Sequence, residues 1–205
     1  MPRRPDMPPL SRSDLRDDPI EQFAEWYARA AAEVPLADAV CLATVDAGGT
    51  PDARMVLLKG VDAAGFRFHT NYRSAKGEQL AGDGRAALVV YWRELDRQVR
   101  VQGRVERLAK AESDAYFGTR PRESQLAAWA SPQSRPLRDR AELDRLVAAA
   151  KRRFEGGEVP RPEGWGGYLL RPDALEFWQG QVGRLHDRFR YIRAGGGWRI
   201  ERLAP

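Results

Sequence analysis

A succession of short apolar segments divided by turn signals constrains the fold of this chain more than any other feature. The first three segments span residues 38–45, 52–61 and 66–70. They are separated by Asp46-Ala47-Gly48-Gly49 and Asp62-Ala63-Ala64-Gly65, which have the composition of tight turns. Because such turns join neighbouring antiparallel strands, this region predicts an antiparallel meander.

Further strands are predicted on both sides of a helical region. Residues 85–92 and 98–107 form two of them, and in the second three valines and Gly103 alternate with Gln and Arg residues. That alternation is typical of a half-buried strand with one polar face. The C-terminal region predicts three strands, with Gly195-Gly196-Gly197 as a tight turn between the last two. Their ranges are 167–179, 185–193 and 197–203.

Helices are predicted around these strands. Asp18 is a suitable N-cap, Pro19 suits the first helical position, and an apolar face follows. A short helix is expected at 74–81. A longer helical stretch, 110–154, is interrupted by prolines and followed by a Gly- and Pro-rich linker at 156–166. The interrupting residues are Pro121, Pro132 and Pro136.

The order of these elements predicts a mainly β fold with peripheral helices (α+β). An antiparallel split or closed β-barrel fits best, because closure removes exposed strand edges; an open α+β sheet is the alternative. A chain of 205 residues with 42% hydrophobic content can bury one substantial core, so we expect a single domain over 18–205. Residues 1–17 carry no hydrophobic period and predict a flexible N-terminal arm, with order beginning near Asp18.

The composition narrows the classes of partner. A formal net charge of +5 favours anionic ligands, but 29 carboxylates are interspersed with the basic residues, which argues against nucleic-acid binding. The only cysteine, Cys41, lies in an apolar run, so no internal disulfide can form and a reducing compartment is expected. No segment has the length of a membrane span and no metal-ligand spacing is present. We therefore expect a cytoplasmic protein without a metal site.

The segment Gly183 to Arg188 carries the most informative chemistry. In an extended strand Arg184, His186 and Arg188 would project from one face. Such a face suits a phosphorylated ligand and proton transfer, because Arg binds phosphate through a planar fork and His titrates near neutral pH. An exposed basic strand is the simpler interpretation. In the same strand Leu185 would point into the core and Asp187 away from His186.

Two other segments have groups that bind anions. Arg54 and Lys59 bracket an apolar strand, but their spacing puts them on opposite faces unless the strand is bulged or lies at a subunit junction. Thr70, Ser74 and Lys76 surround a predicted helix start, where backbone amides, hydroxyls and an ammonium can hold a phosphate. Strand-end charges and ordinary helix capping by Ser74 are the alternatives.

Taken together, these segments resemble the pyridoxine/pyridoxamine 5′-phosphate oxidases, an FMN-dependent family with a split β-barrel. The resemblance runs from Asp18-Pro19 to the final Arg202-Leu203-Ala204-Pro205. The matching blocks, in order, are RMVLLK, HTNYRSAK, RQVRVQG, YFGTRPRESQLAAWAS, QS, EFWQG and GRLHDR.

The resemblance implies an FMN site at the interface of a homodimer. Gln98 would face the flavin ring, and Gln133 and Ser134 would come from the other subunit. The residue before Lys76, commonly basic in the family, is Ala75 here. The complete set implied for the flavin is Arg54, Met55, Val56, Leu57, Leu58, Lys59, His69, Thr70, Lys76, Gln98, Gln133, Ser134, Trp178 and Arg188.

For the substrate, the resemblance implies a phosphate site and a reacting end. Arg184 and His186 correspond to the substrate-binding, catalytic residues beside the reacting carbon. The phosphate site comprises Lys59, Tyr116, Arg120 and Ser124. The last three are four residues apart and would share one helix face, although a helix end is expected near Pro121.

The implied activity is that of a pyridoxal 5′-phosphate synthase. FMN-dependent oxidation of pyridoxamine or pyridoxine 5′-phosphate by O2 would give pyridoxal 5′-phosphate and H2O2, in vitamin B6 biosynthesis and salvage. A related split-barrel flavoprotein acting on another substrate, such as a phenazine precursor, is one alternative. A non-catalytic carrier of pyridoxal phosphate, or an RNA-binding module, is another.

Overall fold

The computed structural model describes residues 7–205, in which eight strands form one antiparallel sheet. The order of the strands is β3-β2-β1-β4-β5-β6-β7-β8, and an additional β3–β6 pairing closes the first six into a barrel. The closed barrel therefore confirms the first of the two predicted folds. The strands are β1 (Ala39–Val45), β2 (Pro51–Asp62), β3 (Gly65–Asn71), β4 (Arg85–Trp92), β5 (Arg97–Arg107), β6 (Trp165–Gln179), β7 (Asp187–Ala194) and β8 (Gly197–Leu203).

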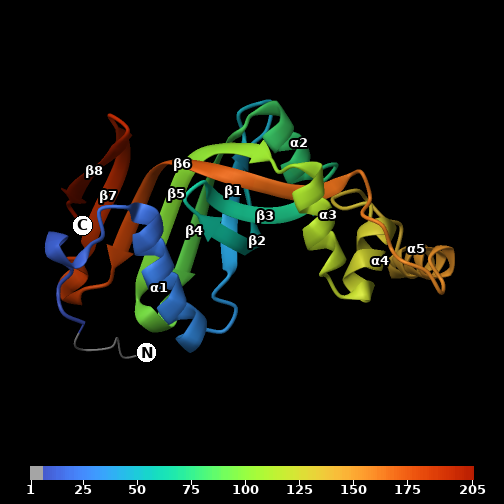
Figure 1. Cartoon of the computed structure of the whole chain (residues 1–205), viewed down its shortest axis with the longest axis horizontal. Coiled ribbons are helices and arrows are strands. Elements are labelled where there is room, and N and C mark those ends of the chain that lie inside the picture. Colours follow the sequence, from blue (N-terminus) through green and yellow to red (C-terminus); the bar gives the residue numbers. More distant parts are fainter. Residues whose placement is uncertain (1–6) are drawn as a thin grey trace.

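The helices lie outside the barrel, as Figure 1 shows. Three of them, α3 to α5, gather at one end of the molecule, and the β7–β8 hairpin lies at the other. The α-helices are α1 (Pro19–Glu33), α2 (Ala75–Gly82), α3 (Lys110–Gly118), α4 (Arg122–Ala130) and α5 (Arg140–Arg153). Short 3-10 turns are η1 (Arg12–Asp14), η2 (Arg93–Leu95) and η3 (Val182–Arg184). Among residues 7–205, none of the helices is long and apolar enough to cross a membrane.

Local sequence signals explain where the first two α-helices begin. The Asp18 carboxylate accepts a hydrogen bond from the amide of Ile20 at 2.7 Å, and Pro19 follows it. Ser74 caps α2 in the same way, with Gly77 as the donor. Both caps satisfy amides that a helix start leaves without an intrahelical partner. The predicted starts of both helices are therefore confirmed.

The main hydrophobic core fills the barrel and continues beneath α1. Phe23 of α1 meets Phe66 edge to face at a centroid separation of 4.9 Å, and Trp26 meets Phe177 at 5.2 Å. Aromatic pairs in this geometry add to the stabilisation from burial alone. Contacts with both β3 and β6 fix α1 across the barrel.

Strand β6 connects the two ends of the molecule. Its N-terminal half pairs with β3, its C-terminal half with β7, and β5 runs beside almost its whole length. Gly103 of β5 lies where the β5–β6 register shifts, and a Cβ atom there would lie 1.9 Å from the carbonyl oxygen of Arg171. The close approach of the two backbones therefore requires glycine.

Two expectations about chain segments were wrong. Residues 185–186 are not part of a strand, because η3 turns the chain and β7 begins at Asp187. Order does not begin near Asp18, because Leu10 and Leu15 are only 6% and 7% exposed and belong to the main core. Their burial was missed because two isolated leucines make no hydrophobic period. Residues 1–6 of the expected arm lie outside the described residues.

Candidate active site

A cavity of about 590 Å³ opens between the barrel and the helices at one end. Strands β2 and β3 form one wall, and α3, α4 and the turn after α4 form the other. Eleven of the residues implied for the flavin or the substrate line it. They are Met55, Val56, Leu57, Lys59, His69, Thr70, Lys76, Tyr116, Arg120, Ser124 and Gln133, with Lys59 serving both sets.

One end of the cavity gathers hydrogen-bonding groups around Lys76. The Lys76 side chain is buried, and its ammonium lies 3.3 Å from both Ser74 Oγ and Gln133 Oε1. Thr70 Oγ1 donates to the same Gln133 oxygen at 3.2 Å. Burial lowers the pKa of Lys76, and the nearby Arg54 guanidinium lowers it further. A bound anion would relieve both effects, so this end suits a phosphate.

Gln133 reaches this site from its own chain, which corrects the expectation that the other subunit supplies it. The turn after α4 carries Gln133 over the start of α2, where it meets Thr70 and Lys76. Ser134 next to it is exposed and has a left-handed backbone, with φ of 69°.

The two cations of β2 are arranged differently. Arg54 is not among the residues that line the cavity; it donates to the carbonyl of Leu42 at 3.2 Å and to the side chain of Gln79. Lys59 lines the cavity and donates to Asp38 at 2.8 Å. A register shift between Leu58 and Gly60 supplies the bulge that the sequence required at Lys59. Leu58 lies in the barrel core, 4% exposed, so only its backbone can face a ligand.

At the other end of the cavity, aromatic rings and an arginine pack together. His69 stacks on Tyr116, and the Arg120 guanidinium lies 4.6 Å above the ring of Trp165. Within residues 7–205, Arg120 Nη1 and both ring nitrogens of His69 are buried without a hydrogen-bond partner. Burial lowers the pKa of His69 to about 4, assisted by Arg120 and Lys59, so the ring is neutral at pH 7.

The expected helix break near Pro121 is confirmed. Helix α3 ends at Gly118 and α4 begins at Arg122, yet Tyr116, Arg120 and Ser124 all line the cavity. Trp165, which belongs to neither implied set, also lines it. Its position directly after the Gly- and Pro-rich linker was the only signal that could have indicated its role.

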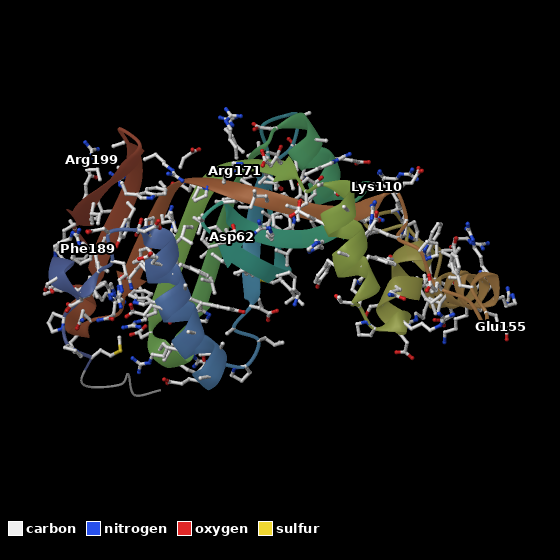
Figure 2. The ribbon with its side chains drawn as sticks, viewed as in Figure 1. Asp62, Lys110, Glu155, Arg171, Phe189 and Arg199 are labelled. Atoms are coloured by element: carbon white, nitrogen blue, oxygen red, sulfur yellow. The ribbon has the colours of Figure 1, made fainter. Side chains whose placement is uncertain are left out.

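A second group of implied residues lies at the far end of β6. Gln98, Trp178 and Arg188 are neighbours in register across β5, β6 and β7, and the His186 ring lies 4.6 Å from that of Trp178. None of these residues, nor Arg184, lines the cavity. An extended strand covers about 36 Å from Gly167, the partner of His69, to Trp178. Figure 2 marks the corresponding ends of the molecule with Phe189 on β7 and Glu155 after α5.

The geometry within this second group differs from the expected flat face. Arg184 lies in η3 with a left-handed φ of 64°, so Arg184, His186 and Arg188 do not alternate along one strand. Leu185 is 71% exposed and does not enter the core. The turn arises because Gly183 and Arg184 both adopt positive φ, a conformation that ends a strand. No direct Asp187–His186 bond forms, as expected.

Comparison with known proteins gives a consistent result over almost the whole chain. Residues 28–152 match the family model described as pyridoxamine 5′-phosphate oxidase. Residues 165–205 match the model of a pyridoxine 5′-phosphate oxidase C-terminal dimerisation region. The proteins named pyridoxine/pyridoxamine 5′-phosphate oxidase from Salinibacter ruber and Rubrobacter xylanophilus are 52% and 54% identical. Each alignment covers 96% of this chain, and 93% and 91% of those relatives respectively.

A solved structure supports the fold assignment. PhzG from Burkholderia lata, in complex with tetrahydrophenazine-1-carboxylic acid, is 34% identical, with a TM-score of 0.88. The match covers 94% of this chain and 95% of PhzG. An FMN-binding protein from Nostoc punctiforme, related to pyridoxamine 5′-phosphate oxidase, is 18% identical with a TM-score of 0.74 and shares the fold. The sequence blocks, the closed barrel and these matches agree: the chain belongs to the pyridoxine/pyridoxamine 5′-phosphate oxidase family.

Proposed function

We infer that this protein is an FMN-dependent oxidase that converts pyridoxamine and pyridoxine 5′-phosphates into pyridoxal 5′-phosphate. The observation that carries this inference is the presence of two separate anion-binding groups in one cavity. One surrounds Lys76 and the other surrounds Arg120. A flavin mononucleotide and a phosphorylated vitamin each bring one phosphate, so two such groups match the two ligands.

The group around Lys76 suits the phosphate of FMN. Thr70 and Ser74 supply hydroxyls, Lys76 supplies a buried ammonium, and the N-terminus of α2 supplies backbone amides. The exposed side chains of Met55 and Leu57 on the adjoining strand offer apolar surface for a flat ring system. Bound FMN would supply the redox chemistry, acceptance of hydride from the substrate and its transfer to oxygen.

The group around Arg120 suits the substrate phosphate. The ring of Trp165 packs against one face of the Arg120 guanidinium. Among the described residues, Nη1 of this guanidinium has no hydrogen-bond partner. Tyr116, Ser124 and Lys59 line the cavity beside it. Because a buried donor without a partner carries a desolvation cost, a hydrogen bond donated by Nη1 to a phosphate oxygen would be favourable.

The second group of implied residues would complete the site in a homodimer. Within one chain Arg184 and His186 lie at the far end of β6 from the cavity, so a single subunit does not bring both groups to one substrate. The match of residues 165–205 to a dimerisation region supports assembly through this end of the chain. In the dimer, Arg184 would orient the substrate ring, and His186 would bind its hydroxyl or transfer a proton.

The structural similarity to PhzG makes a phenazine precursor the alternative substrate. Two observations favour the phosphorylated vitamin. Relatives named as pyridoxine/pyridoxamine 5′-phosphate oxidases share more than half of their aligned residues with this chain, and the phosphate group of Tyr116, Arg120 and Ser124 lines the cavity.

Purified protein tests this function directly. The flavin released on denaturation is identified, and peroxide release is measured with pyridoxamine 5′-phosphate and with unphosphorylated pyridoxamine. We expect FMN, and peroxide chiefly from the phosphorylated substrate. A protein without flavin, or one that oxidises a phenazine precursor but neither vitamin phosphate, would contradict the proposal. Flavin without turnover would indicate a carrier.

A further inference from the structure

We propose that Asp187 is a positioning residue that holds His186 in one orientation and one tautomer. This inference rests on the proposed function, in which His186 acts on the substrate. The Asp187 carboxylate forms no hydrogen bond with the neighbouring His186 ring. It acts through Gln181, and it is anchored by the N-terminal segment and by β8.

Asp187 joins three segments that are distant in the sequence. Its side chain is almost fully buried, with the residue 2% exposed. Oδ2 accepts hydrogen bonds from the amide of Leu10 at 2.9 Å and from Gln181 Nε2 at 2.8 Å. Oδ1 pairs with the Arg202 guanidinium, which also donates to the carbonyl of Leu10. A buried carboxylate with this many partners is firmly held, because losing any of them would leave a buried polar group unpaired.

The connection to His186 runs through Gln181. The Gln181 side chain is held by Asp187, while its backbone amide donates to His186 Nδ1 at 3.1 Å. An amide N–H can only donate, so Nδ1 must accept, and the neutral ring carries its proton on Nε2. Trp178 packs against the ring with an interplanar angle of 41°. The Nε2–H group of His186 therefore points away from the Gln181 amide that holds Nδ1.

The turn between Gln181 and Asp187 needs hydrogen bonds at its ends to hold its shape. Gly183 and Arg184 both have positive φ, which is unfavourable for Arg184. Val182 and Leu185 are 75% and 71% exposed, so their side chains do not fix the turn by packing. The turn is held at its two ends, by Gln181 and by Asp187, and the Asp187 carboxylate connects them.

Asp187→Asn tests the role with little change in shape. The amide replaces one accepting oxygen by a donor, which then faces the donors of Leu10, Gln181 or Arg202. Gln181→Ala is a milder second variant, because it removes the side-chain link yet leaves the backbone amide at His186. Glu201→Gln is the matched control, since Glu201 forms ion pairs with Arg190 and Arg199 on the same hairpin, outside the turn.

Nitrogen-15 NMR of the imidazole ring provides the readout that a merely structural role would not change. The chain has only two histidines, so a His69→Phe background leaves His186 as the single signal. When Asp187 is unchanged, we expect the nitrogen shifts of the Nε2–H tautomer of His186. In Asp187→Asn we expect shifts averaged between the two tautomers, and in Gln181→Ala a smaller change in the same direction.

Turnover is measured in variants that retain His69. We expect turnover of pyridoxamine 5′-phosphate to fall at least about tenfold in Asp187→Asn, because small misplacements of reacting groups are costly.

The outcomes separate this inference from the proposed function. Unchanged His186 nitrogen shifts in both variants, or turnover no lower than in Glu201→Gln, would overturn the role of Asp187. If Asp187→Asn fails to fold, Gln181→Ala decides the matter alone. If no form of the protein oxidises the vitamin phosphates, the proposed function fails, whereas the tautomer of His186 still reports whether Asp187 positions it.

Discussion

His69 and Tyr116 stack with their ring centroids 3.9 Å apart and an interplanar angle of 18°. The pair joins a residue of β3, implied for the flavin, to a residue of α3, implied for the substrate phosphate. Through this contact the barrel supports the helix that carries one side of the cavity. The stack also keeps His69 away from water, and its titration therefore affects stability.

His69→Phe should reduce the loss of stability in acid. The pKa of His69 is about 4 in the folded protein, against 6.5 for an unperturbed histidine, so at pH 7 the ring is neutral in both states. As the pH falls below 6.5 only the unfolded state takes up the proton, and folding stability decreases until the pH reaches about 4. At about pH 5 this contribution should be about 1 kcal/mol after allowance for partial exposure.

Urea unfolding of the flavin-free protein near pH 7 and near pH 5 measures this effect. Phenylalanine keeps the stacking surface, so the variant should lose less stability than the parent between the two values. An equal loss in both proteins would show that His69 is protonated without cost in the folded state.

Arg120→Ala should weaken substrate binding more than it slows turnover. A charge-assisted hydrogen bond contributes about 1.5–3 kcal/mol, which corresponds to a rise in KM of at least about tenfold. Arg120→Lys, which keeps the charge but not the planar guanidinium over Trp165, should be intermediate. Steady-state peroxide release measures both constants. A fall in kcat at unchanged KM would remove Arg120 from the binding group.

Mixed dimers test whether each site is shared by two subunits. Arg120→Ala damages the group in the cavity and Arg184→Ala the group at the far end of β6. At a substrate concentration below the parent KM, each homodimer should therefore be strongly impaired. In a heterodimer with shared sites, one site carries both substitutions and the other carries neither. The isolated heterodimer should then show about half of the parent activity, since one of its two sites is intact.

Co-expression of the two variants with different affinity tags isolates the heterodimer for this assay. The parent protein, tagged and purified in the same way, is the control. If each site were built from one chain, both sites of the heterodimer would be damaged and no activity would return.

Gly103→Ala should destabilise the barrel by at least about 2 kcal/mol, because overpacking against backbone cannot be relieved by a side-chain rotation. The added Cβ would lie 1.9 Å from the carbonyl oxygen of Arg171. Gly82→Ala at the end of α2 is the control, since nothing lies within 4 Å of a Cβ there. Thermal unfolding followed by circular dichroism compares the two. Equal melting temperatures would mean that β5 and β6 can separate locally.

Strand positions were predictable where turn chemistry brackets them. Asp62-Ala63-Ala64-Gly65 marks the β2–β3 turn, and β4 occupies the predicted residues 85–92. Barrel closure through β3 and β6 joins segments about a hundred residues apart, and no local pattern specifies that pairing. The turn at η3 was also missed, because its alternating charged residues have the pattern of a strand.

In the candidate site, too, some residues could be identified from the sequence and others could not. Lys59, Lys76, Tyr116, Arg120 and Ser124 were identified from motif blocks, and all line one cavity. The partnership of Gln133 with Thr70, and the position of Trp165 under Arg120, depend on how loops cross the barrel. Sequence spacing carries no information about such crossings.

Strand β6 is continuous from Trp165 to Gln179 and bears residues of both groups, so its length cannot vary freely. If one residue were inserted within β6, every side chain beyond the insertion would move to the opposite face of the sheet. The residues at the cavity end of β6 and those around Trp178 would then no longer keep their relative orientation within each protomer. Insertions should instead accumulate between α5 and β6, where the connecting residues precede the pairing with β3.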